Sequence, residues 1–383
     1  MLKRYLLAPG PVPVPHEALL AMAAPIIHHR TPQFSEIFRQ VEEGAQRMFG
    51  TSQPVLLLSS SGTGAMEASI TNTMSPGDTV LVVNGGKFGE RWMEIAKAYG
   101  LSVVEIPVEW GCAVKPQQVA DALKQNPGAR AVIMQHSETS TTAIHPVEEI
   151  AALTRNTDVL LIVDGITSVG VVDCPMDKVG IDVLVTGSQK AMMLPPGLAL
   201  IALSEKAWAA SKNAKLPRFY FDLAKERKNV ADNTTAYTPA VTLIIGLKAV
   251  FDLVESEGGW PAVYRRHAIL AEATRRGVEA TGLELLAPTA PSLATTGVWI
   301  PDGVDGGKFT KHLRDVMGVT VAGGQGKLKG KIFRLAHIGY ADTFDVIVGL
   351  SAVEMALRHF GVELAFGRGP AAAQEVLLEM YKK

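Results

Sequence analysis

The sequence contains little cysteine, little net charge and no long hydrophobic run. Its 383 residues include two cysteines, Cys112 and Cys174, which excludes a disulfide framework and favours a reducing compartment, the cytoplasm. A formal net charge of -1 gives no electrostatic reason to expect a nucleic-acid or anionic-membrane partner. No apolar run reaches the roughly 18–20 residues of a membrane span. We therefore expect neither membrane association nor nucleic-acid binding.

The chain begins without the apolar segment that a signal peptide requires. Lys3 and Arg4 lead directly into Ala8-Pro9-Gly10-Pro11-Val12-Pro13. Proline-rich backbone of this kind stays extended, so we expect residues 1–20 to form an ordered arm or strap. Its apolar residues suit a subunit interface, and the alternative is a simple crossing between domains.

Short apolar runs alternate with helix-length amphipathic segments from residue 55 to residue 203. The seven candidate strands are Val55–Leu58, Val80–Val83, Val103–Ile106, Ala131–Met134, Val159–Val163, Asp182–Thr186 and Leu198–Leu203. Helix candidates between them are Arg91–Tyr99, Gln117–Gln125 and Val147–Arg155. This alternation predicts an α/β fold whose mostly parallel seven-stranded sheet is covered on both faces.

A smaller α/β domain is expected at the C-terminal end. The polar segment 205–240 is interpreted as a surface excursion, and a helix at Val241–Glu257 follows it and ends at two glycines. The later candidate elements are a helix at Arg265–Thr281, a strand at Thr296–Ile300, a helix at Gly307–Met317, a strand at Ile332–Ala336 and a helix at Phe344–His359. We therefore divide the chain into the arm (1–20), a large domain (21–257) and a small C-terminal domain (258–383).

A lysine and an aspartate lie where two candidate strands end. Asp164 closes the run Val159–Val163, and Lys190 follows Asp182–Thr186 within a constrained, glycine-containing turn. Ligands of open α/β sheets bind at the carboxyl ends of the strands, so both residues are placed for chemistry. The alternatives are a helix cap for Asp164 and a solvated surface position for Lys190.

A serine- and glycine-rich segment, Ser59–Gly64, follows the first candidate strand and leads into a helix. The free N–H groups and positive dipole end of such a helix suit a phosphate, and Ser61 and Thr63 on either side of Gly62 add hydroxyl donors. The segment lacks both the Walker motif and the full dinucleotide-binding spacing. An ordinary helix cap is the alternative.

Arg334 lies in the middle of the apolar strand Ile332–Ala336. Burying a guanidinium without a partner is costly, so we expect Arg334 to face an anion. Its planar fork suits a substrate carboxylate, and a structural salt bridge is the alternative. The glycine-rich segment Ala322–Gly326 is either a lid over the same site or a plain loop.

Together these parts suit a pyridoxal 5'-phosphate enzyme, in which Lys190 holds the aldehyde as a Schiff base and Asp164 keeps the ring nitrogen protonated. Over nearly the whole chain the sequence resembles the class V aminotransferases of fold type I, particularly the alanine–glyoxylate and serine–glyoxylate aminotransferases. The most specific likeness runs from Asp164 to Lys190, with Pro195-Pro196-Gly197 behind it. Ser61-Gly62-Thr63 matches the phosphate loop of that family.

The resemblance implies further contacts with the cofactor. Thr139 would hydrogen-bond the ring oxygen, and Gln189 would contact the phosphate. Phe88 occupies the position where several relatives stack a Trp or another aromatic ring. Thr238 matches a threonine that reaches the phosphate of the neighbouring subunit, and Thr235 stands where some relatives have a tyrosine. A homodimer with its active sites at the interface is therefore implied.

The implied activity is amino-group transfer in two half-reactions, from an amino acid to a 2-oxo acid. Arg334 would clamp the substrate carboxylate, and Lys190 would move the α proton. No second arginine marks a dicarboxylate site, so alanine or serine is the expected donor and glyoxylate the expected acceptor. The stretch His28–Arg30 has a counterpart near the site in relatives, or it is a solvated turn. No metal ion is expected.

Other functions stay open on the same residues. A lyase or aldolase uses the same cofactor and lysine, and a cofactor-binding partner protein of reduced activity would keep them. A nicotinamide-dependent dehydrogenase competes at the level of the fold, but the dinucleotide fingerprint is missing. A cysteine desulfurase needs a nucleophilic cysteine near Arg334, and no cysteine follows Cys174.

Overall fold

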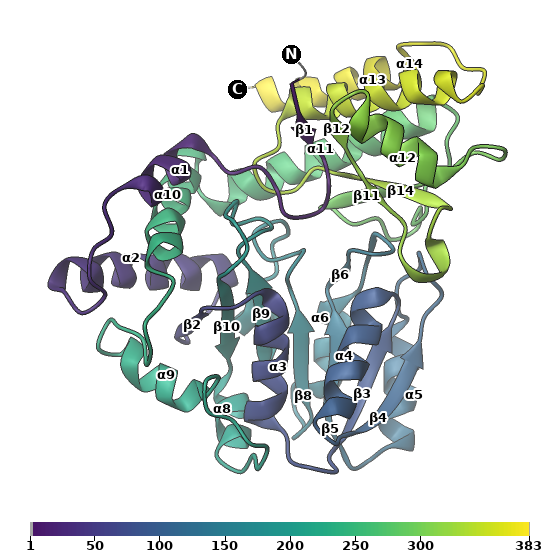
Figure 1. The fold of residues 1–383 in the computed structure, drawn as a ribbon. Helices are drawn as coiled ribbons and strands as arrows, with labels where there is room; N and C mark the ends of the chain where they lie inside the picture. Colours follow the sequence, from purple (N-terminus) through teal and green to yellow (C-terminus); the bar gives the residue numbers. More distant parts are fainter. Residues whose placement is uncertain (1–2, 383) are drawn as a thin grey trace.

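A seven-stranded sheet forms the centre of the large domain in this computed structural model, which describes residues 3–382 (Figure 1). Its strands, in spatial order, are β2 (Val55–Leu58), β10 (Ala199–Leu203), β9 (Val183–Gly187), β8 (Leu160–Asp164), β5 (Ala129–Gln135), β3 (Thr79–Asn84) and β4 (Ser102–Pro107). Strand β10 is antiparallel to both of its neighbours, and the other pairs are parallel. The predicted sheet is confirmed, and each expected strand overlaps an observed one.

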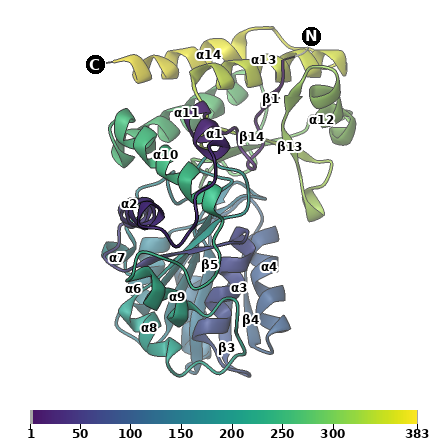
Figure 2. The ribbon, with the colours of Figure 1, turned by 60° about the vertical axis from the view of Figure 1, so that its left-hand side comes forward.

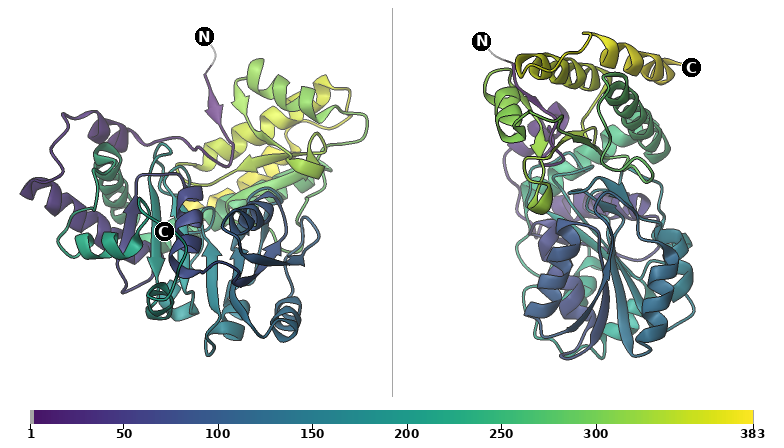
Figure 3. Two further views of the ribbon diagram at one scale, coloured as in Figure 1. Left: turned by 60° about the horizontal axis from the view of Figure 1, so that its bottom comes forward. Right: turned by 90° about the vertical axis from the view of Figure 1, so that its right-hand side faces the viewer.

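Helices cover both faces of the sheet, as the edge-on view shows (Figure 3, right). They include α2 (Pro32–Phe49), α3 (Gly62–Thr73), α4 (Lys87–Ala98), α5 (Pro116–Gln125), α6 (Val147–Thr154) and α7 (Met176–Val179). Helix α10 (Val241–Glu257) packs on α2. Residues on strands β2, β8, β9 and β10 are buried along their whole length. Burial on both faces explains why these strands read as continuous apolar runs.

The segment 205–240 contains two helices that the apolar pattern does not reveal. These are α8 (Glu205–Ser211) and α9 (Leu223–Val230). Helix α9 buries little more than its two end residues, and its N-terminus is capped by Asp222, whose side chain accepts two backbone N–H groups. This helix is defined by its cap and not by hydrophobic periodicity. The prediction of a surface excursion for segment 205–240 was therefore incomplete, because it included no helices.

The small domain is built on a three-stranded antiparallel sheet in the order β11 (Thr295–Trp299), β14 (Ile332–Ala336), β13 (Ala322–Gly323). Its helices are α11 (Trp260–Ala280), α12 (Gly306–Asp315), α13 (Thr343–His359) and α14 (Arg368–Leu377), with 3-10 turns at Gly326–Leu328 and Leu378–Tyr381. Helix α14 was not expected. The domain has its own hydrophobic core, although Trp260 and Val263 at the start of α11 still belong to the large-domain core. The boundary at residue 257 remains a proposal.

The N-terminal arm crosses from the small domain to the large one. Strand β1 (Tyr5–Leu6) pairs in parallel with β12 (Val319–Thr320), and the side chain of Leu7 joins the small-domain core. Helix α1 (His16–Ala23) then packs against α10 (Figure 2). The arm is thus a crossing strap, which was one of the two interpretations of its sequence.

No helix within residues 3–382 is long and apolar enough to cross a membrane.

Candidate active site

The residues singled out in the sequence gather at one edge of the large sheet. Asp164 ends β8, Lys190 follows β9, and Ser61 precedes α3 directly after β2. These three strands run in the same direction, so their carboxyl ends meet at one edge. The small domain lies over this edge (Figure 1). The site is therefore bounded by the strand ends on one side and by the small domain on the other.

Lys190 is a buried lysine held by the arm. Its side chain is 8% exposed, and Nζ donates a hydrogen bond to the carbonyl oxygen of Pro9. Gly10 makes this approach possible, because a side-chain carbon at that position would lie 2.6 Å from Nζ. Burial and the charge of Arg334 lower the pKa of Lys190 to about 8, whereas Asp164 opposes the shift. The surface-lysine alternative is wrong.

Asp164 is buried beside Lys190. One carboxylate oxygen, Oδ1, accepts a hydrogen bond from the backbone N–H of Ile166 at 2.9 Å. Burial raises the pKa of Asp164 to about 6, although Ile166, the indole of Trp92 and the positive charges of Lys190 and Arg91 all lower it. Burial disfavours the ionised form of Asp164, and a cationic partner would stabilise that form. A protonated pyridine nitrogen would provide such a partner.

A cradle for an anion forms where α3 begins. Gly62 lies against Gly187 and Ile166: a side-chain carbon at residue 62 would lie 2.5 Å from Ile166 Cδ1. The hydroxyl of Thr63 accepts a hydrogen bond from Arg91 at 3.3 Å, so a cation already lies at the cradle. Gln189 Oε1 is buried without a partner among the described residues. Because an amide can turn to present its N–H₂ group, this residue suits a phosphate.

Arg334 and Thr139 lie together on the small-domain side. Arg334 is 4% exposed and donates to the carbonyl oxygens of Thr139 at 2.8 Å and of Gly323 at 2.8 and 3.2 Å. Within residues 3–382 its hydrogen bonds go to carbonyl groups and none goes to a carboxylate, which counts against the structural salt bridge. The Thr139 hydroxyl is 2.5 Å from the hydroxyl of Thr167. Burial lowers the pKa of Arg334 to about 10.

Three residues at this site, Arg91, Glu138 and Pro9, were not recognised from the sequence. Arg91 and Glu138 both contact the predicted residue Phe88 at the start of α4. The guanidinium carbon of Arg91 lies 4.9 Å from the centre of the Phe88 ring. The backbone N–H of Phe88 donates to the buried carboxylate of Glu138 at 3.1 Å. These three residues were missed because each acts through a contact between distant parts of the chain. The sequence gave one indication for Glu138, which lies in a polar run, residues 135–142, between apolar segments.

The glycine-rich segment Ala322–Gly326 connects the two domains. The Gly323 carbonyl holds Arg334, and the loop then passes the large-domain ring of Trp110, which lies 4.5 Å from Lys327 Nζ. Glycine is favoured at residue 326, where φ is +52° and an added side-chain carbon would lie 3.0 Å from the Trp110 ring. The segment is therefore a wall of the site that rests on the large domain, not a plain loop.

Thr235 and Thr238 lie apart from this group, on a loop beside Ser59. The two threonines and Ser59 line a small hollow. The Thr235 hydroxyl donates a hydrogen bond to the carbonyl oxygen of Tyr237 at 2.6 Å. Arg30 donates to the hydroxyl of Thr234 at 2.7 Å. The stretch His28–Arg30 and the threonine loop therefore form one surface of the protein.

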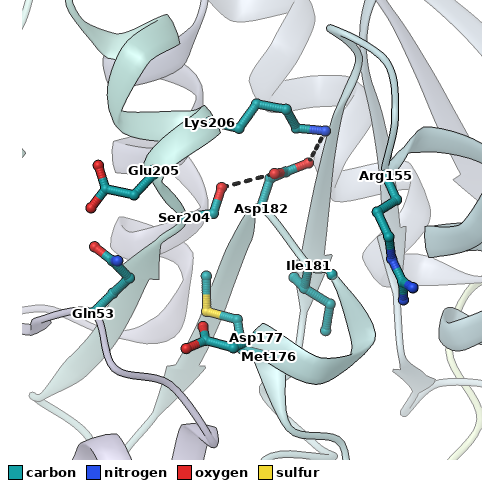
Figure 4. Close-up of a pocket in the computed structure, with 10 residues that line it drawn as sticks. Gln53, Arg155, Met176, Asp177, Ile181, Asp182, Ser204, Glu205 and Lys206 are labelled. Carbon is teal, nitrogen blue, oxygen red and sulfur yellow. Dashed lines mark hydrogen bonds and ion pairs between the residues drawn. The ribbon is translucent and has the colours of Figure 1, made fainter.

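A separate hollow of about 280 Å³ lies at the opposite end of the sheet, where β9 begins (Figure 4). Its central carboxylate, Asp182, receives hydrogen bonds from the Leu161 N–H and the Ser204 hydroxyl, both at 2.8 Å, and pairs with Lys206 at 2.8 Å. All of these polar groups are satisfied by the protein itself. The hollow thus contains a structural ion pair, and it lies at the end of the sheet opposite the carboxyl ends where ligands of such folds bind.

Comparison with known proteins now decides the family. Residues 14–329 match the family model described as aminotransferase class V. The chain belongs to the class V aminotransferases. It is therefore a pyridoxal phosphate-dependent aminotransferase of fold type I. The phosphate cradle, the buried lysine and the aspartate of this chain fit that cofactor.

Similar proteins carry several functional names. The chain is 42% identical to the soluble hydrogenase small subunit of Synechococcus sp., covering 98% of both chains. It is 37% identical to the L-aspartate–glyoxylate aminotransferase of Paracoccus denitrificans (96% and 94% covered) and 34% identical to the serine–glyoxylate aminotransferase of Methylorubrum extorquens (98% and 96%). Among solved structures, the pyridoxamine–pyruvate aminotransferase of Mesorhizobium loti superposes with a TM-score of 0.93 at 33% identity, covering 99% of this chain and 98% of that chain.

Proposed function

We propose that this aminotransferase moves the amino group of a small amino acid, alanine or serine, to glyoxylate. The observation that carries the proposal is that the buried Arg334 of the small domain lies close enough to interact with Lys190, which is next to Asp164 at the strand ends of the large sheet. The anion cradle at the start of α3 lies at the same edge of the sheet. The names of the glyoxylate aminotransferases similar to this chain support the acceptor. One of them uses aspartate, so aspartate belongs among the donors to be tested.

Each residue has a distinct task. When bound, pyridoxal phosphate supplies a ring that accepts electrons from the bond broken at the substrate α carbon. Lys190 holds the aldehyde carbon and, once released, takes the proton from the α carbon at Nζ, for which its lowered pKa suits it. Asp164 holds the proton on the ring nitrogen. Arg334 clamps the substrate carboxylate and so orients the α C–H bond.

The remaining residues bind the cofactor without moving protons. Ser61, Gly62, Thr63 and Gln189 hold its phosphate, as the cradle at the start of α3 supports. Phe88 packs on the ring, and Thr139 donates to the ring oxygen. Thr238 acts across the subunit interface, on the phosphate of the partner's site.

The decisive experiment records the visible spectrum of the purified protein and adds each amino acid in turn. Bleaching of the yellow form by alanine or serine, with formation of the matching 2-oxo acid and of glycine from glyoxylate, supports the proposal. Lys190→Ala must remove the yellow form, whereas Lys212→Ala, a change at an exposed lysine, must keep it. Release of an aldehyde fragment from serine without an oxo acid would instead support the lyase alternative. A yellow protein that no donor bleaches would support the partner-protein alternative.

The hydrogenase name of one relative calls for a direct test. Iron–sulfur centres are held by cysteine thiolates, and this chain has two cysteines, Cys112 and Cys174. The lysine-based site has no role in such chemistry. Hydrogen-dependent reduction of a viologen dye by the purified chain, measured beside the transaminase assay, distinguishes the two functions.

We also infer a homodimer with an active site at each interface, in the cytoplasm. Three strongly exposed apolar residues support this: Leu20 (74% exposed), Ile26 (70%) and Phe219 (77%). The ring of Phe219 lies 5.9 Å from that of Tyr237, on the loop of Thr235 and Thr238 that is expected to reach the partner's phosphate. Ile26 precedes Arg30, which donates to Thr234 at the start of the same loop. Sedimentation velocity tests it: Ile26→Asp should give a monomer, whereas Met355→Asp, at an exposed methionine on α13, should not. A monomeric parent protein would refute it.

A further inference from the structure

The start of helix α4 is capped by residues from another part of the chain. Its own N-cap, Gly86, provides no side chain. The backbone N–H of Lys87 donates to the Ser140 hydroxyl at 2.9 Å, and those of Phe88 and Gly89 both donate to Glu138 Oε2 at 3.1 Å. Three N–H groups that a helix start leaves unpaired are thus satisfied by one short segment that follows β5.

Glu138 is fully buried and its second oxygen is also used. Oε1 accepts the N–H of Ser140 at 3.1 Å and its hydroxyl at 2.5 Å. Gly86 allows this contact, because a side-chain carbon there would lie 2.5 Å from the Glu138 carboxyl carbon. All four donors are neutral. When ionised, the carboxylate is therefore bound by dipoles, and among residues 3–382 no cation bonds to it.

The same segment also holds Arg334. The carbonyl oxygen of its central residue, Thr139, accepts a hydrogen bond of 2.8 Å from the Arg334 guanidinium. The negative charge of Glu138 favours the charged form of this arginine, which burial otherwise disfavours. Burial raises the pKa of Glu138 itself to about 7, while its bonds to Ser140 and Gly89 lower it. The segment 138–140 therefore connects the start of α4, which carries Phe88, to Arg334.

We propose that Glu138 is a positioning residue with two roles: it fixes Phe88 and Arg334 relative to each other through Ser140 and Thr139, and its charge weakens the hold of Arg334 on carboxylates. The inference rests on the proposed function, in which Arg334 binds the substrate carboxylate and Phe88 packs on the cofactor ring. A weaker ground-state hold helps turnover, since product must leave the same clamp. The two roles predict effects of opposite sign on binding and on rate.

The test uses the cofactor-loaded protein at pH 8, above the pKa of about 7 that burial gives Glu138, so that its carboxylate is charged. Acetate, a carboxylate without an amino group, is the binding probe. Acetate affinity is followed by the shift that it causes in the visible band. Glu138→Gln keeps the side-chain size and removes the charge, so acetate should bind about three- to tenfold more tightly. Its kcat should fall at least tenfold, and the circular dichroism of the cofactor band should weaken because Phe88 is held less firmly. A purely structural role would weaken binding and rate together.

Controls separate charge, geometry and stability. Glu138→Asp keeps the charge and shortens the side chain, so acetate affinity should stay near that of the parent while kcat falls. Glu354→Gln changes another buried carboxylate that accepts two backbone N–H groups, those of Gly367 at 2.6 Å and Gly369 at 2.8 Å, far from the site. It should lower the melting temperature and leave acetate affinity and kcat unchanged.

The outcomes distinguish the inference from the function on which it rests. If Arg334→Gln leaves acetate binding unchanged, the proposed carboxylate clamp fails. If Arg334→Gln abolishes acetate binding but Glu138→Gln binds acetate no more tightly than the parent, the inference fails alone. Tighter acetate binding in the Asp variant than in the parent would also overturn it, because that variant retains the charge.

Discussion

Replacing Gly10 with alanine perturbs the lysine through a residue 180 positions away. The new methyl carbon would lie 2.6 Å from Lys190 Nζ, whereas ordinary contacts begin at 3.4 Å. The amine must therefore move by about 0.8 Å, and a displacement of this size at a reacting atom costs on the order of 10- to 100-fold in rate. The backbone adds a second cost: φ is +109° at Gly10, and a non-glycine residue there loses about 1–3 kcal/mol of stability.

A matched variant separates the two costs. Gly77 has φ +83° and no atom within 4 Å of the position of an added side-chain carbon. Gly77→Ala therefore tests the backbone cost without any contact with the site. We expect both variants to unfold at lower denaturant concentration, and only Gly10→Ala to form the yellow cofactor complex slowly and to turn over poorly. If Gly10→Ala captures pyridoxal phosphate at the same rate as Gly77→Ala, the contact between the arm and Lys190 does not affect cofactor binding, and the reasoning is refuted.

Four further outcomes follow from the same site. Asp164→Asn should stabilise the cofactor-free protein by about 1–3 kcal/mol at pH 8, as calorimetry can check. The folded-state pKa of Asp164 is near 6, above the unfolded value of 3.8, so the wild-type protein loses stability as pH rises from about 4 to 6, and the full cost is present at pH 8. Turnover should fall roughly 100-fold or more, and a destabilised variant would contradict the prediction. Cofactor capture by the cofactor-free protein should speed up as pH rises through about 8, since neutral Lys190 is the nucleophile; stopped-flow absorbance measures it, and a rate flat between pH 7 and 9 would refute the lowered pKa. Because this pKa lies below the unfolded value of 10.5, the unfolded chain binds more protons between about pH 8 and 10.5, and the contribution of Lys190 to stability grows with pH across that window. Arg334→Gln should raise KM for the amino acid about 100-fold with little loss of cofactor, because a bidentate charged contact of about 3 kcal/mol disappears; an unchanged KM would remove Arg334 from the substrate site.

Residues at strand ends were the most predictable part of this protein. The seven apolar runs correspond to the seven strands of the large sheet, most of which are buried on both faces and so need no polar residues. Asp164 and Lys190 stand out because they follow such runs. Arg334 stood out as a charge within an apolar strand. The geometry of a parallel sheet then brings such ends together without further information.

Contacts between distant segments were beyond the sequence pattern. Glu138 caps a helix 50 residues earlier in the chain, and the Pro9 carbonyl meets a lysine 181 residues later. Neither residue differs from its neighbours in polarity or period, so no local rule identifies its partner. Helix α9 was missed because a cap and two apolar end residues define it, and such a signal is too short for periodicity to reveal.

The crossing of the arm has a practical consequence for work on this protein. Residues 5–7 complete a strand pair and a core in the small domain, and the next few residues lie against the lysine of the large domain. Any motion of the small domain therefore pulls on the backbone that covers the reactive amine. Shortening the N-terminus by ten residues is thus a mutation of the active site, and an affinity tag belongs at the other end of the chain.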